Sequence, residues 1–403
     1  MRRPVRFLTT AEYDKEEVMR IIRVADLQPG CVVGRALLDE KGQILLQRGV
    51  TLSENYIQAL KAKGYTRLFV QDTEVDDGTP PEEDISPETR ALATQTVKKS
   101  FEEIEKQFSA VKKQSYDDIL QACNSDGARV LLSDRGPLAH IDEVITSILG
   151  EVLSRSTLAG LTSIKSTDSQ LYDHSVDVCV VAIMIGRTVN LSNDRLRQLA
   201  AGCLLHDIGM VFVDSNLDRV NIIRHHTRLG YELLKNGGDP DLLAPHVAYE
   251  HHERQDGGGL PRGLRSGNRL QRDRSLPPPI PTLIGEIAAV ADAYDNLLSG
   301  GPSTEGVTPD AALMTIRNAA GPHFNKEVVE AFLRVTPVYP VGTEIIVRSE
   351  QLHNYTGVVR EVNPEQLDRP VISLLRNNYG KPITPIEVDL AEQTSMIIRC
   401  RGL

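Results

Sequence analysis

The chain has 403 residues, 40% apolar and 25% charged, a composition typical of a globular protein of about two or three domains. Its formal net charge of −10 argues against bulk binding to nucleic acid or to an anionic membrane. No apolar run approaches the roughly 20 residues that a membrane-spanning helix needs, and the five cysteines form no C-x-x-C pair. The basic start, Met1-Arg2-Arg3, is not followed by an apolar signal region. We therefore expect a cytoplasmic protein that does not bind membranes.

Residues 1–71 have the pattern of a compact α/β module. Apolar runs at 20–24 and 65–70 predict strands, and Ser53 can cap a helix that ends before Gly64. This stretch contains no cluster of catalytic residue types. We interpret it as a regulatory or docking module.

Residues 72–87 form an acidic, proline-bearing linker with too little apolar surface to offset the entropy of ordering. Residues 88–133 are expected to be connecting helices, since apolar residues recur every three to five positions from Pro87 to about Ala122. Two interpretations are open: a helix packed on the next domain, or a coiled-coil dimer. No heptad is sustained, which favours the first, and a homodimer stays open.

Residues 134–336 are predicted to be helical, and residues 337–403 to be a small β domain. The predicted helices are 141–153, 171–189, 195–206, 227–235, 242–252, 280–298, 309–320 and 326–335. The predicted strands are 344–348, 356–360, 371–375 and 383–388. The expected fold class is therefore mainly α: a helical bundle with a small N-terminal α/β domain and a small C-terminal β domain.

An adjacent pair, His206-Asp207, ends an apolar helical run and has further histidines and an aspartate around it in the sequence. Neighbours on a helix point about 100° apart, so the pair can reach two positions of one site. The other members of the set are His174, His226, His251, His252 and Asp292. Imidazoles and carboxylates suit first-row metals, and two metals about 3.5–4 Å apart can clamp a phosphodiester and lower the pKa of water. The alternative is a set of capping or core histidines.

This order of residues resembles the HD-GYP family, metal-dependent phosphodiesterases of cyclic di-GMP within the HD superfamily. The resemblance covers about residues 134–336, and the run from His251 to Pro261 (HHERQDGGGLP) is its most specific part. The family reads Gly-Tyr-Pro where this chain has Gly259-Leu260-Pro261. Residues 1–71 resemble the small domain of unknown function that often precedes HD-GYP domains.

The resemblance implies a phosphodiesterase that opens cyclic di-GMP to pGpG, with further hydrolysis to GMP left open, and with Asp207 and His206 as catalytic residues. Asp207 is expected to bridge two metals, with His174, His206 and Asp292 on one and the remaining histidines, His226, His251 and His252, on the other. Gln170 stands where family members often use Glu to hold a third metal, so we expect two divalent metals per chain, iron or manganese.

Two other functions stay open. Met210 replaces the lysine of the family's His-Asp-Ile-Gly-Lys motif, and Ser299-Gly300-Gly301-Pro302 stands where Arg-Pro-Tyr is expected. These differences favour a receptor that retains the metals and binds cyclic di-GMP with little or no turnover. A hydrolase of another nucleotide is the third alternative, although the run from His251 to Pro261 argues against it.

Candidate substrate contacts are Gly258 and Leu260, which lie within the family-specific run, and Arg262 and Arg265, which follow it. Arg262 begins a loop that also holds Arg265, Arg269, Arg272 and Arg274, and a guanidinium can grip a phosphate through two hydrogen bonds. This loop is expected to be a lid over the site or a solvated segment.

Three acidic residues are expected to support the metal ligands: Asp173, Glu253 and Asp295. In the family the Gly-Tyr-Pro stretch has been linked to docking of diguanylate cyclase domains. Leu260 lacks the tyrosine ring and hydroxyl, so we expect that docking to be weak or absent.

Overall fold

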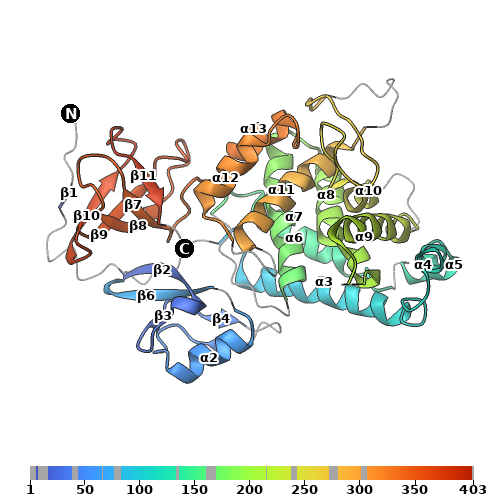
Figure 1. Ribbon diagram of the computed structural model, residues 1–403, viewed down its shortest axis with the longest axis horizontal. Coiled ribbons are helices and arrows are strands. Elements are labelled where there is room, and N and C mark those ends of the chain that lie inside the picture. Colours follow the sequence, from blue (N-terminus) through green and yellow to red (C-terminus); the bar gives the residue numbers. More distant parts are fainter. Residues whose placement is uncertain are drawn as a thin grey trace.

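The computed structural model describes most of the chain in three parts: an N-terminal α/β module, a central helical domain and a C-terminal β-sheet (Figure 1). The described residues are 6–7, 17–38, 44–65, 67–76, 83–132, 136–159, 169–214, 216–236, 243–271, 280–300 and 306–401. Within these residues, no helix is both long enough and apolar enough to cross a bilayer.

The N-terminal module packs one helix against a small antiparallel sheet. The three-stranded sheet has the order β2 (Glu17–Arg23), β6 (Arg67–Asp76), β3 (Val32–Val33). Helix α2 (Glu54–Ala62) begins at Ser53, whose hydroxyl accepts the Tyr56 N–H as predicted for a cap. The remaining elements are η1 (Val24–Asp26) and the hairpin of β4 (Leu37–Leu38) and β5 (Ile44–Leu46). Strand β6 extends to Asp76, into the segment that was expected to be a linker.

The connecting region consists of two packed helices and a short third one. Helix α3 (Pro87–Gln107) buries Val97, Phe101 and Ile104 in the core of the helical domain. A new helix, α4 (Tyr116–Cys123), starts at a capping box in which Ser115 and Asp118 exchange hydrogen bonds, and α5 (Asp126–Leu131) follows. The expectation of packing on the next domain is confirmed for α3.

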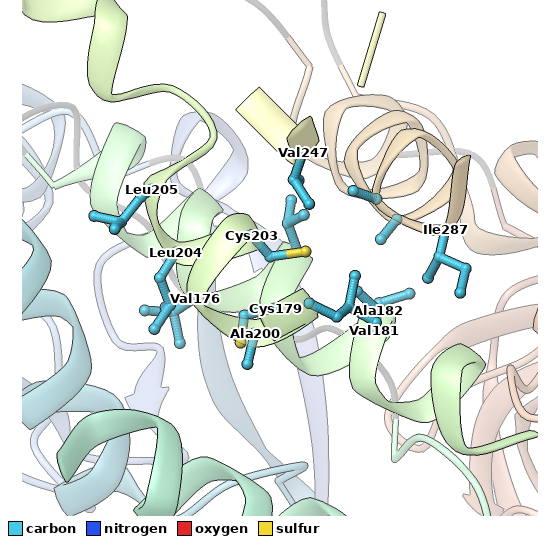
Figure 2. Close-up of a cluster of buried hydrophobic side chains, with 14 of the residues drawn as sticks. Val176, Cys179, Val181, Ala182, Ala200, Cys203, Leu204, Leu205, Val247 and Ile287 are labelled. Atoms are coloured by element: carbon cyan, nitrogen blue, oxygen red, sulfur yellow. The ribbon is translucent and has the colours of Figure 1, made fainter. Parts of the chain in front are cut away.

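The helical domain surrounds α7 (Gln170–Thr188), whose middle residues are fully buried. Figure 2 shows the apolar contacts in which Val181 and Cys203 take part, between α7, α8 and their neighbours. The other helices of this domain are α6 (Ile141–Val152), α8 (Asn193–Leu205), η2 (Ile208–Phe212), α9 (Arg219–Leu234), α10 (Ala244–Glu250), α11 (Leu283–Ser299), α12 (Pro309–Asn318) and α13 (Lys326–Leu333). Helix α9 begins eight residues before the predicted start at 227.

The C-terminal part is an antiparallel sheet with its own apolar core, and a two-residue strand from the N-terminus completes it. The sheet order is β1-β10-β9-β8-β7-β11. The strands are β1 (Arg6–Phe7), β7 (Glu344–Val347), β8 (Thr356–Glu361), β9 (Val371–Arg376), β10 (Pro382–Asp389) and β11 (Ile398–Cys400). The four predicted strands are present. Strands β1 and β11 were not anticipated.

Candidate metal centre

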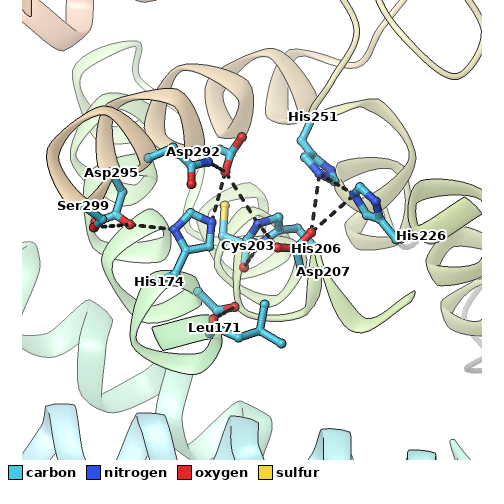
Figure 3. Close-up of polar contacts among 12 residues, drawn as sticks. Leu171, His174, Cys203, His206, Asp207, His226, His251, Asp292, Asp295 and Ser299 are labelled. Atoms are coloured by element: carbon cyan, nitrogen blue, oxygen red, sulfur yellow. Dashed lines mark hydrogen bonds and ion pairs between the residues drawn. The ribbon is translucent and has the colours of Figure 1, made fainter. Parts of the chain in front are cut away.

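Seven side chains from five helix segments meet in the middle of the helical domain. They are His174 on α7, His206 and Asp207 after α8, His226 on α9, His251 and His252 after α10, and Asp292 on α11. Figure 3 labels all of them except His252. They form three overlapping groups, and within each group the potential ligand atoms lie within 4.8 Å of one another. Residues that are more than a hundred positions apart in sequence therefore share one site.

One side of the cluster is rich in carboxylates. Nε2 of His174 lies 3.0 Å from Oδ1 of Asp292, and its Nδ1 lies 2.6 Å from Oδ2 of Asp295. Burial alone would lower the pKa of His174, but hydrogen bonds to the two carboxylates outweigh it and raise the pKa to about 10. Nε2 of His206 lies 3.9 Å from Oδ1 of Asp292, and we call His174, His206, Asp292 and Asp295 the carboxylate side.

Asp207 lies between the two sides of the cluster. Its Oδ2 is 3.4 Å from Nε2 of His206, whereas its Oδ1 is 3.4 Å from Nε2 of His226 and 3.8 Å from Nε2 of His251. Burial raises the pKa of Asp207, but the surrounding histidines hold it well below the usual range of a carboxyl group. The carboxylate is therefore ionised and presents one oxygen to each side.

The other side of the cluster consists of His226, His251 and His252, which we call the imidazole side. Nδ1 of His226 donates to the Ile222 carbonyl at 2.8 Å, and Nδ1 of His251 donates to the Val247 carbonyl at 3.0 Å. A carbonyl only accepts, so each Nδ1 carries the proton and each Nε2 offers a lone pair. Burial is the main cause that lowers the pKa values of these histidines, that of His252 to about 3.

These donors fit a metal centre better than they fit one another. Nε2 of His226 and Nε2 of His251 lie 3.2 Å apart, and in neutral rings two lone pairs face each other there. Nε2 of His206 is buried and has no hydrogen-bond partner among the described residues, while its Nδ1 donates to the Cys203 carbonyl at 2.7 Å. Unshared imidazole nitrogens beside ionised carboxylates are the donor set that divalent transition metals prefer.

Gly209 allows the backbone after Asp207 to lie directly against α9. A Cβ at this position would come within 2.0 Å of the His226 carbonyl oxygen, so only glycine fits without a shift of the backbone. The close approach brings Asp207 beside His226. This explains why a glycine follows the His-Asp pair at this spacing.

The model of the HD domain family matches residues 171–297, the stretch that holds all seven of these residues. The chain contains an HD domain. Cyclic di-GMP phosphodiesterase PA4108 from Pseudomonas aeruginosa is 31% identical over 273 residues, which cover 64% of this chain and 62% of that protein. The cyclic di-GMP phosphodiesterase response regulator RpfG from Xanthomonas campestris is 31% identical over 225 residues, or 53% of this chain and 55% of that protein.

These matches confirm the resemblance to HD-GYP phosphodiesterases and the mainly α fold, although the chain spans less than two thirds of the length of either relative. A solved structure titled Bd1817, a HDG"Y"P protein from Bdellovibrio bacteriovorus, is 16% identical with a TM-score of 0.40, covering 78% of this chain and 98% of that one.

Around the HD domain's cluster, Asp295 supports His174, whereas Asp173 does not. The Asp173 carboxylate instead accepts hydrogen bonds from Ser169 at 2.5 Å and Thr94 at 2.8 Å. Adjacent residues of a helix diverge by about 100°, which points Asp173 toward α3 and away from the His174 ring. The expectation for Asp173 therefore needs this correction. Asp295 lies three residues after Asp292, on the same face of α11.

The loop after His252 is held by Glu253. Its carboxylate accepts the backbone N–H groups of Arg262 and Leu264, each at 2.8 Å. The Leu260 N–H donates to the His252 carbonyl at 3.0 Å, and the Gly258 N–H donates to Asp256 at 2.8 Å. These bonds shape the loop, and the proposed substrate contacts of Gly258 and Leu260 stay predictions.

The arginine loop does not present its first guanidinium to the cluster. Nη2 of Arg262 pairs with the buried Glu250 at 2.5 Å, and its guanidinium lies 4.4 Å from the centre of the Tyr249 ring. Arg265 forms a β-bridge with Asp256 and is exposed. Arg269 is exposed as well and pairs with Glu327. The remaining two arginines of the loop, Arg272 and Arg274, lie outside the described residues.

Sequence reasoning missed Arg219, the first residue of α9. It lies seven residues before His226 and is exposed. Its position on the helix was not visible because the predicted helix began at 227. The signal that could have found it is Asp218, an N-cap residue type whose carboxylate accepts the Asn221 N–H at 3.1 Å.

Proposed function

We propose that this chain is a metal-dependent phosphodiesterase that opens cyclic di-GMP to pGpG and carries it on to GMP. The observation that supports this most is the position of Asp207, one oxygen toward each side of a cluster of unshared imidazole nitrogens. Relatives about 31% identical are named cyclic di-GMP phosphodiesterases, which supports the choice of substrate.

Two divalent metals, iron or manganese, are proposed for the cluster. His174, His206 and Asp292 would hold one, and the imidazole side would hold the other, with Asp207 between them. When bound, such a pair supplies Lewis acidity to a phosphodiester and lowers the pKa of water. Gln170 is neutral, so no third metal is expected.

The chain's own residues prepare this site before substrate arrives. Asp207 is held ionised, and Asp295 fixes the ring of His174 through Nδ1. His206 donates Nδ1–H to the Cys203 carbonyl, which directs its Nε2 at Asp207 and Asp292. We propose Asp207 and His206 as the catalytic pair because these two residues, grouped with His251, lie where the two sides of the cluster meet.

A receptor without useful turnover is the second candidate, and Met210 favours it. Met210 is half-buried, one turn of η2 beyond Asp207, and its thioether carries no charge. A positioned cation at a phosphoryl site contributes several kcal/mol, about 3–4, to transition-state stabilisation. Loss of this cation would leave cyclic di-GMP binding in place while slowing its hydrolysis.

One incubation separates the two candidates. The protein is purified without oxygen, loaded with iron or manganese, mixed with cyclic di-GMP, and the products are separated by anion exchange. Accumulation of pGpG and then GMP is the expected result. Binding without product would establish the receptor, and neither binding nor product would contradict both.

Elemental analysis of the same preparation tests the metals. A value near two per chain is expected. A value near three would show that Gln170 does not exclude a further metal, and a value near zero after loading would contradict the metal centre.

Partners and regulation are proposed from the other parts of the chain. The N-terminal module, residues 1–71, is proposed to regulate the HD domain across the linker at 72–87. Leu260 offers neither ring nor hydroxyl, so docking of diguanylate cyclase domains through this loop is proposed to be weak. A pull-down that is strong and is lost in Leu260→Ala would contradict this.

A further inference from the structure

The cluster is not equally covered on all sides. The side chains of His206, His226 and His251 are at most 4% exposed. The Asp207 side chain is 17% exposed, and His252 is the one half-buried histidine of the set. A substrate therefore meets the cluster over Asp207 and His252.

Arg219 stands at this opening. Seven residues of helix bring a side chain back to within roughly 20° of the same direction, so Arg219 lies on the face of α9 that carries His226. The positive charge of Arg219 acts on His252, the half-buried histidine of this opening.

Among the described residues, the guanidinium of Arg219 has no hydrogen-bond partner. It is exposed and forms no ion pair within the ranges that the structure describes. The adjacent Asp218 carboxylate is occupied by Asn221, which donates from its backbone at 3.1 Å and from Nδ2 at 2.6 Å. Arg262, by contrast, is held by Glu250 and the Tyr249 ring.

We propose that Arg219 binds a phosphate of the cyclic dinucleotide at the open side of the cluster, the side marked by Asp207 and His252. The inference rests on the proposed function, because it needs an anionic substrate over the metals. A guanidinium grips a phosphate through two hydrogen bonds and stays charged at all relevant pH values. In this chain Arg219 would supply a cation to the substrate phosphate, whereas the thioether of Met210 carries no charge.

The test compares Arg219→Ala with Arg224→Ala in metal-loaded protein. Arg224 is exposed on the same helix but lies roughly 160° around from His226, so it is the matched control. Cyclic di-GMP affinity is measured by calorimetry, and metal content and melting temperature are measured on the same samples. Arg219→Lys, which keeps the charge but loses the fork, is the conservative variant.

Arg219→Ala is expected to weaken cyclic di-GMP binding by about 10- to 100-fold, the usual effect of losing a hydrogen bond to a charged group. Metal content should be unchanged, Arg219→Lys should recover part of the affinity, and Arg224→Ala should bind normally. Equal loss in Arg224→Ala, or normal affinity in Arg219→Ala, would overturn the inference.

The outcomes for the inference and for the proposed function are separate. Wild-type binding without turnover, with the loss confined to Arg219→Ala, would support the inference and contradict the phosphodiesterase. Wild-type turnover together with normal cyclic di-GMP binding by Arg219→Ala would support the phosphodiesterase and contradict the inference. Absence of binding by metal-loaded wild type would contradict both.

Discussion

The two sides of the cluster differ in how one histidine is held. On the carboxylate side, Nδ1 of His174 faces the Asp295 carboxylate, whereas Nδ1 of His206, like Nδ1 of His226 and His251 on the imidazole side, faces a helix carbonyl. The first arrangement brings formal negative charge beside the ligand, and the second brings only oriented dipoles. Metal affinity on the carboxylate side should therefore depend on removable side chains, whereas on the imidazole side it depends on the backbone of α9 and α10.

The carboxylate side also has polar contacts with α3 and with the N-terminal module. Asp177, one turn after His174 on α7, pairs with Arg90 of α3 at 2.6 Å, and both side chains are mostly buried. From the N-terminal module, Arg35 pairs with Glu83, and Nη2 of Arg67 donates to the Leu298 carbonyl of α11 at 3.1 Å. Both helices of the carboxylate side thus have polar contacts outside the cluster.

The largest expected effect comes from removing the residue that the two sides share. Loss of a side chain that only supports a ligand typically costs about 10- to 100-fold in metal affinity or activity, and a shared ligand should cost more. Asp207→Ala should therefore lose metal from both sides together with turnover. Elemental analysis and cyclic di-GMP hydrolysis measure the two losses.

Asp214→Ala is the control for this variant, because Asp214 is an exposed aspartate seven residues further along the chain. It should keep metal and activity. If Asp207→Ala retained one metal, the carboxylate would belong to one side alone and the two sides would be independent.

Much of this site was visible in the sequence, and the reasons are physical. A metal cluster needs fixed residue types at fixed places, so His206-Asp207 and His251-His252 stand out beside apolar helices. Asp295 could be inferred because three residues along a helix face the same way as Asp292. The roles of these residues stay proposals until the metals are measured.

Other features depend on where elements begin and on what they pack against. Arg219 was missed because the predicted helix began at 227, and its relation to His226 exists only if α9 starts at 219. Asp173 was misassigned because only packing against α3 shows that Thr94 takes its carboxylate. The pairing of Arg35 with Glu83 joins separate parts of the fold, and no local pattern encodes it.

Asp295→Asn should affect the carboxylate side alone. The amide removes the negative charge beside Nδ1 of His174, so affinity for one metal is expected to fall by about 10- to 100-fold while the other is retained. Metal titration against a chelator should resolve one weakened and one unchanged step. Ser299→Ala is the control, because its hydroxyl contacts Asp295 only at 3.4 Å. Equal weakening of both steps would remove the distinction between the sides.

In metal-stripped protein the two sides should respond to pH in opposite directions. The pKa of His252 is lowered to about 3 by burial and by neighbouring charges, so its contribution to stability is present above about 6.5 and is lost as pH falls toward 3. The pKa of His174 is raised to about 10, so its contribution is present below about 6.5 and is lost as pH rises through 10.

Melting temperatures of metal-stripped protein across this pH range measure both changes: the fall toward acid pH (the acid limb) and the fall toward alkaline pH (the alkaline limb). His252→Gln should flatten the acid limb, and Asp295→Asn should flatten the alkaline limb. An acid limb that is unchanged in His252→Gln would show that other groups control it.

The smallest expected effect reaches the carboxylate side from the N-terminal module. Arg67 contacts the Leu298 carbonyl of α11 and Arg35 contacts Glu83, so neither arginine touches the cluster itself. Burial is the main cause that lowers the pKa of Arg35 to about 10, and the positive charge of Arg90 contributes. Removing both side chains, in the double variant Arg35→Ala with Arg67→Ala, should loosen α7 and α11 slightly. Binding of the metal on the carboxylate side should weaken by a few-fold, since coupling between sites is typically about 5- to 150-fold and these contacts are indirect.

The control is Lys61→Ala, an exposed change on α2 of the same module, which should have no effect. Weakening confined to the carboxylate step would make the module a modulator of one metal position, whereas weakening of the imidazole step would mean that the module acts on the helical domain as a whole.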